Sequence, residues 1–250
     1  MTDPVADTIR LLVGHAGGYL HNVIREHRVT CLDCGHPVDD TVMCYPCHRD
    51  GPIAPVELVT PLIYAVGGTQ SATLLRHYKD DHNAAARRGH ALVIRRMLYL
   101  ALMLHQRCIE DTIGRPVDHR VVVPSLHHRP GIHPLAAIAA DTRATDDRLR
   151  LIPAPRARTD RIISDRQFTL NPDVDLRGRH IMLLDDTWTT GSRARSAALT
   201  LRAAGADDIS VLVVGRWLAP EHGDNTDFIA TRLHRDYDPR ICPVSGEHCS

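Results

Sequence analysis

The sequence predicts an α/β fold with a parallel sheet, preceded by a small cysteine-rich module. Two observations support this fold class. From residue 56 onward, short apolar runs alternate with helical patterns, which is typical of a parallel sheet covered by helices. Upstream, four cysteines in two C-x-x-C pairs lie in a segment with too few apolar residues for a core of its own. A chain of 250 residues fits one large domain with a small appendage.

The elements are predicted from the spacing of apolar residues. A helix is expected at residues 4–28, where apolar side chains recur every three or four positions, and a loop-rich module at 29–50. The elements expected next are a strand at 56–65, a helix starting at 71–78, the longest helix at 83–109, a strand at 120–124, a helix at 135–142 and a strand at 149–152. A strand at 180–184, a helix at 193–204 and a strand at 209–214 then form a βαβ unit, with Gly205 as the helix stop.

These elements suggest three regions. Residues 1–51 form the first helix and the cysteine module, residues 52–218 the α/β domain, and residues 219–250 a C-terminal tail. Hydrophobic residues make up 43% of the chain and charged residues 24%, which allows a packed core and excludes wholesale disorder. The 30 basic residues balance the 30 acidic ones, so the net charge gives no general attraction to nucleic acid or to a membrane surface.

No membrane span or export signal is expected. The most apolar stretch, residues 91–104, contains Arg95 and Arg96 and is shorter than the roughly 20 residues of a membrane-spanning helix. The N-terminal residues lack the basic start and long apolar centre of a signal peptide. We therefore expect a location in a reducing cytoplasm, where paired cysteines favour metal over disulfides.

The two cysteine pairs have the spacing of a zinc site. Cys31 and Cys34 enclose two residues, as do Cys44 and Cys47, so that each turn can present two sulfurs to one tetrahedral Zn²⁺. A redox role would require only one pair and is disfavoured. We predict a structural zinc ribbon. Loss of one thiolate is expected to unfold the ribbon locally and to leave the α/β domain folded.

The other cysteines give weaker signals. Cys108 lies on the longest predicted helix and is expected to be a small core residue. Cys242, His248 and Cys249 could add a second metal site or fold back on the ribbon. Without a second C-x-x-C pair we favour an irregular tail.

The segment I-M-L-L-D-D-T-W-T-T-G-S-R, residues 181–193, is the most specific motif. An apolar strand leads into two carboxylates, Asp185 and Asp186, and then into a loop that enters a helix. Ligands of parallel sheets bind beyond the carboxyl ends of the strands. Residues 187–192 present unpaired N–H groups and the positive end of the helix dipole, so they can hold a phosphate that Gly191 lets approach closely. The carboxylates suit sugar hydroxyls or a Mg²⁺ ion carried by a polyphosphate.

An ordinary acidic strand end followed by a helix cap is the alternative interpretation of this motif. Two adjacent aspartates with T-T-G-S after an apolar strand are too particular a combination for us to prefer it. A Walker P-loop is excluded, because the G-x-x-x-x-G-K pattern is absent and the only lysine, Lys79, lies far upstream.

The motif resembles the signature of the type I phosphoribosyltransferases, an apolar strand followed by two acidic residues and a T-T-G-[ST] phosphate loop. The resemblance implies a phosphoribosyltransferase-like domain in which Asp185 and Asp186 are catalytic and contact the ribose hydroxyls of phosphoribosyl pyrophosphate (PRPP). It also implies that Mg²⁺ bridges ribose and pyrophosphate. The residues implied to hold the 5′-phosphate are Thr187, Thr189, Thr190, Gly191 and Ser192.

The order of motifs over nearly the whole chain resembles the ComF family of these enzymes. The shared features are the four-cysteine zinc ribbon, a Tyr78-Lys79 pair, a Val-Pro-Ser segment at residues 123–125, and the acidic pair. The resemblance places the Val-Pro-Ser segment near the pyrophosphate. Lys79 and Arg129 could each face the pyrophosphate, although an exposed salt bridge is equally consistent with the sequence.

Two functions of different classes follow. One is pentosyl transfer from PRPP, or from another ribose 5-phosphate compound, to a nitrogen nucleophile, with release of pyrophosphate. The other is a non-catalytic PRPP sensor or DNA-uptake accessory protein, whose ribbon binds a protein or single-stranded DNA. This second function is favoured by the replacement, at residues 129–134, of the R-G-F-N-Q segment typical of ComF proteins. A purely structural zinc protein is disfavoured by the T-T-G-S loop.

Overall fold

A four-stranded, all-parallel sheet forms the centre of the molecule. The computed structural model describes residues 3–127, 131–145, 148–223 and 225–249. The strands follow the order β1 (Leu58–Val66), β6 (Asp208–Leu218), β5 (His180–Trp188) and β2 (His119–Val122) across the sheet. The predicted α/β class and the parallel sheet are confirmed. The βαβ unit places β5 and β6 side by side in the middle of the sheet.

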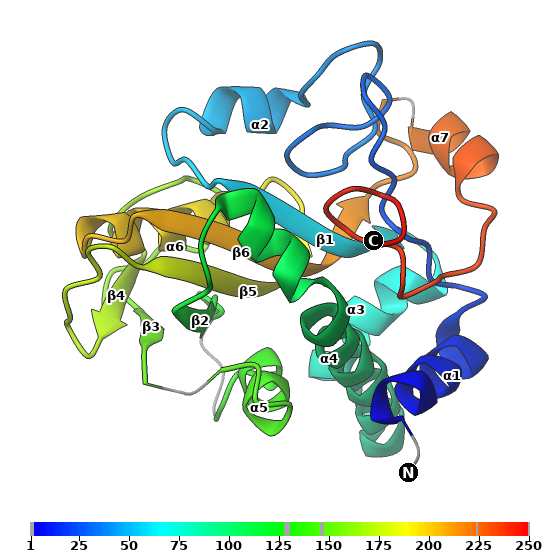
Figure 1. Cartoon of the computed structure of the whole chain (residues 1–250), viewed down its shortest axis with the longest axis horizontal. Coiled ribbons are helices and arrows are strands. Elements are labelled where there is room, and N and C mark those ends of the chain that lie inside the picture. Colours follow the sequence, from blue (N-terminus) through cyan, green and yellow to red (C-terminus); the bar gives the residue numbers. More distant parts are fainter. Residues whose placement is uncertain (1–2, 128–130, 146–147, 224, 250) are drawn as a thin grey trace.

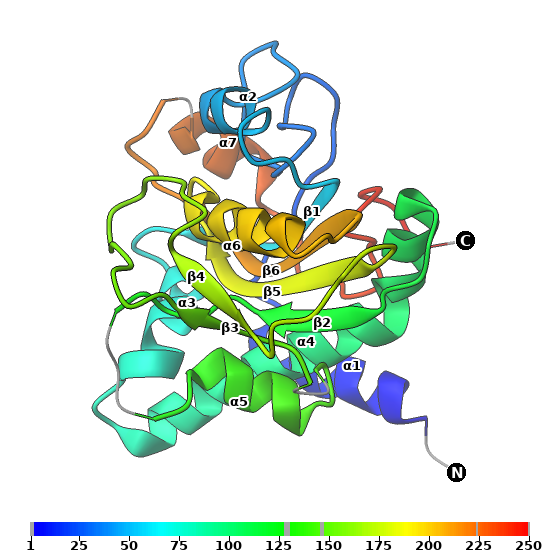
Figure 2. The ribbon, with the colours of Figure 1, turned by 90° about the vertical axis from the view of Figure 1, so that its left-hand side faces the viewer.

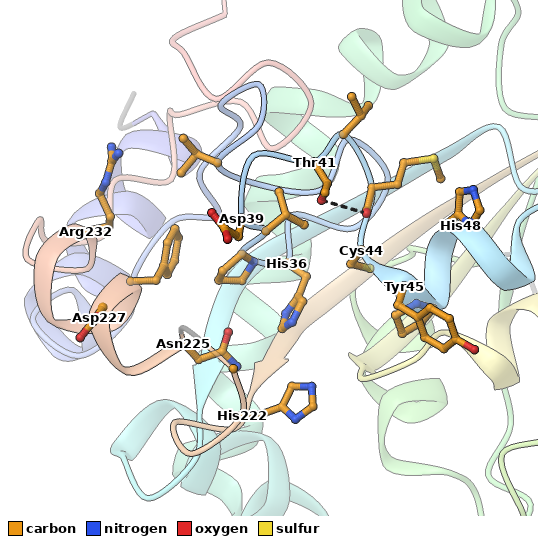
Figure 3. A pocket seen from close by; sticks show the side chains of 18 of the residues that line it. His36, Asp39, Thr41, Cys44, Tyr45, His48, His222, Asn225, Asp227 and Arg232 are labelled. Carbon is orange, nitrogen blue, oxygen red and sulfur yellow. Dashed lines mark hydrogen bonds between the residues drawn. The ribbon is translucent and has the colours of Figure 1, made fainter.

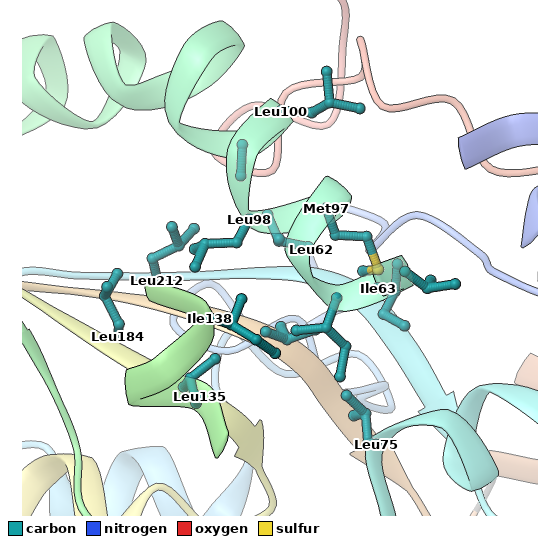
Figure 4. Close-up of a cluster of buried hydrophobic side chains, with 14 of the residues drawn as sticks. Leu62, Ile63, Leu75, Met97, Leu98, Leu100, Leu135, Ile138, Leu184 and Leu212 are labelled. Atoms are coloured by element: carbon teal, nitrogen blue, oxygen red, sulfur yellow. The ribbon is translucent and has the colours of Figure 1, made fainter. Parts of the chain in front are cut away.

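Helices cover both faces of this sheet (Figures 1 and 2). The helices on one face are α1 (Pro4–Ala16), α3 (Gln70–Asp80), α4 (Ala84–Ile113) and α5 (Pro134–Asp141), and α6 (Ser192–Ala203) covers the other. Met182 and Leu184 of β5 share a buried cluster with α4, whereas Ile181 and Leu183 share one with α6. Figure 4 shows the first cluster, around Leu98 of α4. Within the described parts of the chain, no helix combines the length and apolarity that a bilayer crossing requires.

Several elements differ from the prediction, among them the first helix, the strand at residues 149–152 and the cysteine module. The first helix ends at Ala16, since Gly17 and Gly18 follow it. The strand predicted at residues 149–152 is β3 (Arg150–Pro153), which lies outside the main sheet and pairs antiparallel with β4 (Phe168–Asn171). The cysteine module contains a short helix, α2 (Tyr45–Asp50), in which Pro46 occupies the first turn, where a missing N–H costs nothing.

The C-terminal residues, expected from sequence to form an irregular tail, contain one helix and pack against the body of the molecule. They include a helix, α7 (Asn225–Arg232), and a return segment beside the N-terminal residues. The Tyr237 N–H donates to the carbonyl of Gly17 at 3.0 Å, and the Asn22 side chain exchanges two hydrogen bonds of 2.9 Å with the backbone of Asp238. Backbone hydrogen bonds of this kind leave no periodic pattern in a sequence, which explains why the packing was not predicted.

Candidate functional site

The four cysteines of the predicted ribbon meet in the structure. Their sulfur atoms all lie within 4.8 Å of one another, and all four side chains are buried. The Cys34 and Cys44 sulfurs are 3.7 Å apart. Zn–S bonds of about 2.3 Å at tetrahedral angles would separate two sulfurs by about 3.8 Å. The cluster could therefore hold a structural metal such as zinc.

Local backbone geometry builds this cluster. The N–H of Gly35, directly after the first pair, donates to the carbonyl of Cys31 at 2.9 Å and closes the first turn. Gly35 has a φ of +68°, and a Cβ there would lie 2.4 Å from Cγ1 of Val23, so no other residue fits. Cys44 caps the start of α2 and Cys47 lies in its first turn, which brings their sulfurs together.

The cysteine module shares its core with the α/β domain. Trp188 and the alanines of α6 belong to the same buried cluster as the four cysteines. Arg195 of α6 is 1% exposed, donates to the Ala54 carbonyl at 2.8 Å and pairs with Asp33, between the first two cysteines, at 3.4 Å. Its guanidinium also lies over the Trp188 ring, 5.6 Å from the centroid. The helix that follows the T-T-G-S loop, α6, therefore contacts the ribbon directly through the Arg195–Asp33 pair.

The acidic pair forms part of β5 instead of following it. β5 was expected to end at residue 184, but β6 pairs with it as far as Trp188, opposite Arg216. Because successive side chains of a strand point to opposite faces, Asp186 lies on the α3 side of the sheet and Asp185 on the α6 side.

Asp186 is brought together with Tyr78 and Lys79, two residues of the last turn of α3. The Tyr78 hydroxyl donates to Oδ2 of Asp186 at 2.6 Å, and the Lys79 ammonium forms an ion pair with the same oxygen. Burial alone would raise the pKa of Asp186, but Lys79 and Tyr78 hold this pKa below its usual value. Asp186 is therefore an ionised carboxylate at neutral pH.

Asp185 has a different environment. Its Oδ1 accepts the N–H of Asp186 at 2.8 Å. Burial, together with the negative charge of Asp186, raises the pKa of Asp185 to about 7. A ligand that brings positive charge, such as a divalent cation, would favour its ionised form.

The loop after β5 leaves the start of α6 open. Gly191, the N-cap of α6, has a φ of +80° and provides no side chain to bond the first-turn N–H groups. A Cβ at this position would lie 2.1 Å from the Trp188 indole. The glycine is required here by packing against Trp188 as well as by its backbone conformation.

Arg216, which the sequence analysis missed, fixes the orientation of this loop. It is 3% exposed, and one guanidinium nitrogen donates to the carbonyls of Trp188 at 2.8 Å and Thr189 at 3.0 Å. Since the C=O and N–H of a trans peptide point in opposite directions, the N–H groups of Thr189 and Thr190 face away from Arg216. Arg216 could have been found from sequence, because it follows an apolar run of a strand and arginine is rarely buried without partners.

The Val-Pro-Ser segment also lies next to the end of β5. The Val123 N–H donates to the Leu184 carbonyl at 2.9 Å, and an Arg193 guanidinium nitrogen lies 3.3 Å from Nε2 of His127. A cavity of about 470 Å³, lined by Pro124, Ser125 and His133 among others, opens beside this segment. Arg129 lies outside the described residues.

A second cavity, of about 810 Å³, lies between the ribbon and α7 (Figure 3). His36, Tyr45, His222 and Asn225 line it. Its described lining includes neither the acidic pair nor residues 187–192, so it is separate from the β5–α6 site.

No protein-family model matches this chain, and no curated protein matches its sequence significantly.

Proposed function

We propose that this protein is a phosphoribosyltransferase-like protein of the ComF type. It binds Mg²⁺-PRPP, or a related ribose 5-phosphate compound, at the carboxyl end of β5. One observation carries the proposal. An acidic pair at the end of a central parallel strand is followed by a loop that leads directly into the N-terminus of α6, which has no side-chain cap. Ligands of parallel sheets bind at this edge, and helix N-termini attract phosphate.

The loop is assigned the 5′-phosphate. Arg216 binds the carbonyls of Trp188 and Thr189. The N–H groups of Thr189 and Thr190 point the opposite way and are left to donate to an anion. The hydroxyls of Thr187, Thr189, Thr190 and Ser192 are further donors. Gly191 supports this loop conformation, because it adopts a φ of +80° and lets the backbone pack against the Trp188 indole.

The acidic pair is assigned the ribose and its metal. Mg²⁺ would arrive with the pyrophosphate, and Asp185 is the carboxylate suited to support it, because Asp186 already faces Lys79. As pyrophosphate leaves the anomeric carbon, positive charge develops on the sugar, and the two carboxylates can stabilise it. A nitrogen nucleophile then forms the new bond at that carbon. Lys79 positions Asp186 through their ion pair.

A sensor without catalysis is the second candidate. The ion pair of Asp186 with Lys79 favours it, because that carboxylate already has a partner before any ligand binds. Pyrophosphate release from PRPP in the presence of candidate bases and amines separates the two functions. Release that depends on both the acceptor and Asp186 indicates a transferase, whereas binding without release indicates a sensor.

Calorimetric titration tests the site itself. Asp185→Asn and Asp186→Asn should weaken Mg²⁺-PRPP about ten- to a hundred-fold, the effect of one lost charge-assisted hydrogen bond, and leave inorganic phosphate nearly unaffected. Gly191→Val should weaken PRPP, ribose 5-phosphate and phosphate alike. Asp111→Asn, on an exposed carboxylate near the end of α4, is the matched control and should change none of these affinities. Equal weakening of every ligand by the aspartate variants would contradict the assigned roles.

A further inference from the structure

A second cluster of metal-ligating side chains lies away from the β5–α6 site. His105 and Cys108 of α4 meet Cys242 and Cys249 of the C-terminal return segment, and their ligand atoms all lie within 4.8 Å of one another. His105 and Cys108 are three residues apart, so they project from the same face of α4. The expectation that Cys108 is a core residue is wrong, because its side chain is only partly buried. Its sulfur lies 3.1 Å from that of Cys249.

His105 is oriented as a metal-binding histidine is. Its Nε2 lies 2.8 Å from the Pro239 carbonyl, which can only accept, so Nε2 carries the proton. In the neutral ring Nδ1 then carries the free lone pair, and it faces the Cys249 sulfur at 3.1 Å. Metal-ligating histidines characteristically donate their second ring N–H to a carbonyl or carboxylate in this way, which fixes both tautomer and ring orientation.

A tight backbone turn presents the two C-terminal cysteines together. The Cys242 N–H donates to the Glu247 carbonyl at 2.6 Å, and the Gly246 N–H donates to the Cys242 carbonyl at 2.8 Å. Ile241 and His248 form an antiparallel bridge. Gly246 has a φ of +81°, and a Cβ there would lie 2.9 Å from Cβ of Arg25. The turn therefore depends on a glycine, as does the turn after Cys34 in the ribbon.

One arginine connects this turn to the ribbon. Nε of Arg25 donates to the Pro243 carbonyl at 2.9 Å. Its Nη1 donates to the carbonyls of Leu32 and Asp33, inside the first C-x-x-C turn, at 3.1 and 3.2 Å. A single guanidinium therefore bridges the two cysteine turns by hydrogen bonds.

We propose that His105, Cys108, Cys242 and Cys249 form a second structural zinc site, which fastens the C-terminal segment to α4. Three thiolates and one imidazole are a ligand set typical of structural zinc. Zinc would require the Cys108 and Cys249 sulfurs to move apart from 3.1 Å to about 3.8 Å, a smaller change than closure to the roughly 2.05 Å of a disulfide, which would also leave His105 and Cys242 without a role. This site is independent of the function proposed for the β5–α6 connection.

Zinc stoichiometry of the full-length chain, purified under reducing conditions and dialysed against a chelator, tests the proposal. The wild-type protein should retain two zinc ions per chain by elemental analysis. Cys249→Ser should retain one, and because Cys249 is exposed the substitution itself leaves no buried cavity. Cys31→Ser should also retain one. His248→Ala is the matched control: His248 lies beside Cys249 in the turn but outside the cluster, so two ions should remain.

Cobalt substitution gives a second readout. The spectrum lost in Cys249→Ser should be that of a three-sulfur, one-nitrogen site, and the remaining spectrum that of a four-sulfur site. One zinc ion in the wild-type protein, with no change in Cys249→Ser, would overturn the proposal. So would mass-spectrometric detection of a Cys108–Cys249 disulfide in the protein that retains only one zinc ion.

Discussion

At the end of β5, two adjacent aspartates have different environments, next to the candidate phosphate loop. Asp185 and Asp186 lie on opposite faces of the strand, and of the two only Asp186 forms an ion pair within the described residues, with Lys79. Their pKa values move apart as a result, upward for Asp185 and downward for Asp186. Divergent environments for neighbouring carboxyl groups are typical of functional sites. The aspartates could be recognised from sequence, whereas their separate environments could not, because these depend on where α3 packs.

Asp185→Asn should stabilise the protein at alkaline pH. An unfolded aspartate ionises near pH 4, but Asp185 in the folded protein ionises only at about pH 7. The native state therefore binds the proton more tightly, and ionisation costs stability increasingly as the pH rises from 4 to 7. The variant should gain about 1 to 2 kcal/mol over the wild type between pH 5 and pH 8, measured by urea unfolding. An equal difference at both pH values would show that Asp185 ionises normally.

Gly191→Ala should destabilise the fold more than an alanine at another left-handed glycine does. Gly114, with a φ of +87° and open space around its missing Cβ, is the matched control. Gly114→Ala should lose about 1 kcal/mol of unfolding free energy from the backbone conformation alone. Gly191→Ala should lose about 1 to 3 kcal/mol more, because its methyl group meets the Trp188 indole. Equal losses would show that Trp188 can move aside, and that the loop is less constrained than the packing indicates.

Helix α6 contributes to both the candidate phosphate loop and the core around the cysteine cluster. Its N-terminus opens on the candidate phosphate loop, and its buried face contacts the cysteine cluster and Trp188. The sequence predicted both parts, since the cysteine spacing and the strand-loop-helix pattern are local signals. Their contact depends on Arg195 and Asp33, which are 162 positions apart, and no local pattern reports such a pairing. The antiparallel β3–β4 pair was missed for a different reason, because β4 is only four residues long.

Loss of a ribbon thiolate should therefore reach the α/β domain. From sequence, Cys31→Ser was expected to unfold the ribbon alone. Because the four cysteines share a buried cluster with α6, we now expect the variant to lower the thermal midpoint of the whole chain. Differential scanning calorimetry should show one transition, shifted downward in the variant. Two separate transitions, with the larger at the wild-type temperature, would support the original expectation.

In the whole molecule, residues 237–243 pack against residues 17–25 beside the sheet. Tyr237 bonds to Gly17, Asp238 to Asn22, and Pro243 to Arg25, so C-terminal residues meet the segment between α1 and the ribbon (Figure 1). Apolar periodicity predicted the sheet, the long helix and the βαβ unit, because these elements bury regular faces. The return segment lacks such a face, and its contacts are made by backbone groups and scattered cysteines, which explains why it was missed.

Amide hydrogen exchange tests the central claim most directly, because it reports where the ligand binds. With Mg²⁺-PRPP present, exchange in the peptides that cover residues 185–193 should slow, and the amides of Thr189, Thr190 and Ser192 should be protected most. The protection should require Mg²⁺ and should be lost in Asp186→Asn, while the peptides lining the cavity between the ribbon and α7 stay unchanged. Protection confined to that cavity, or none at millimolar PRPP and Mg²⁺, would contradict the account.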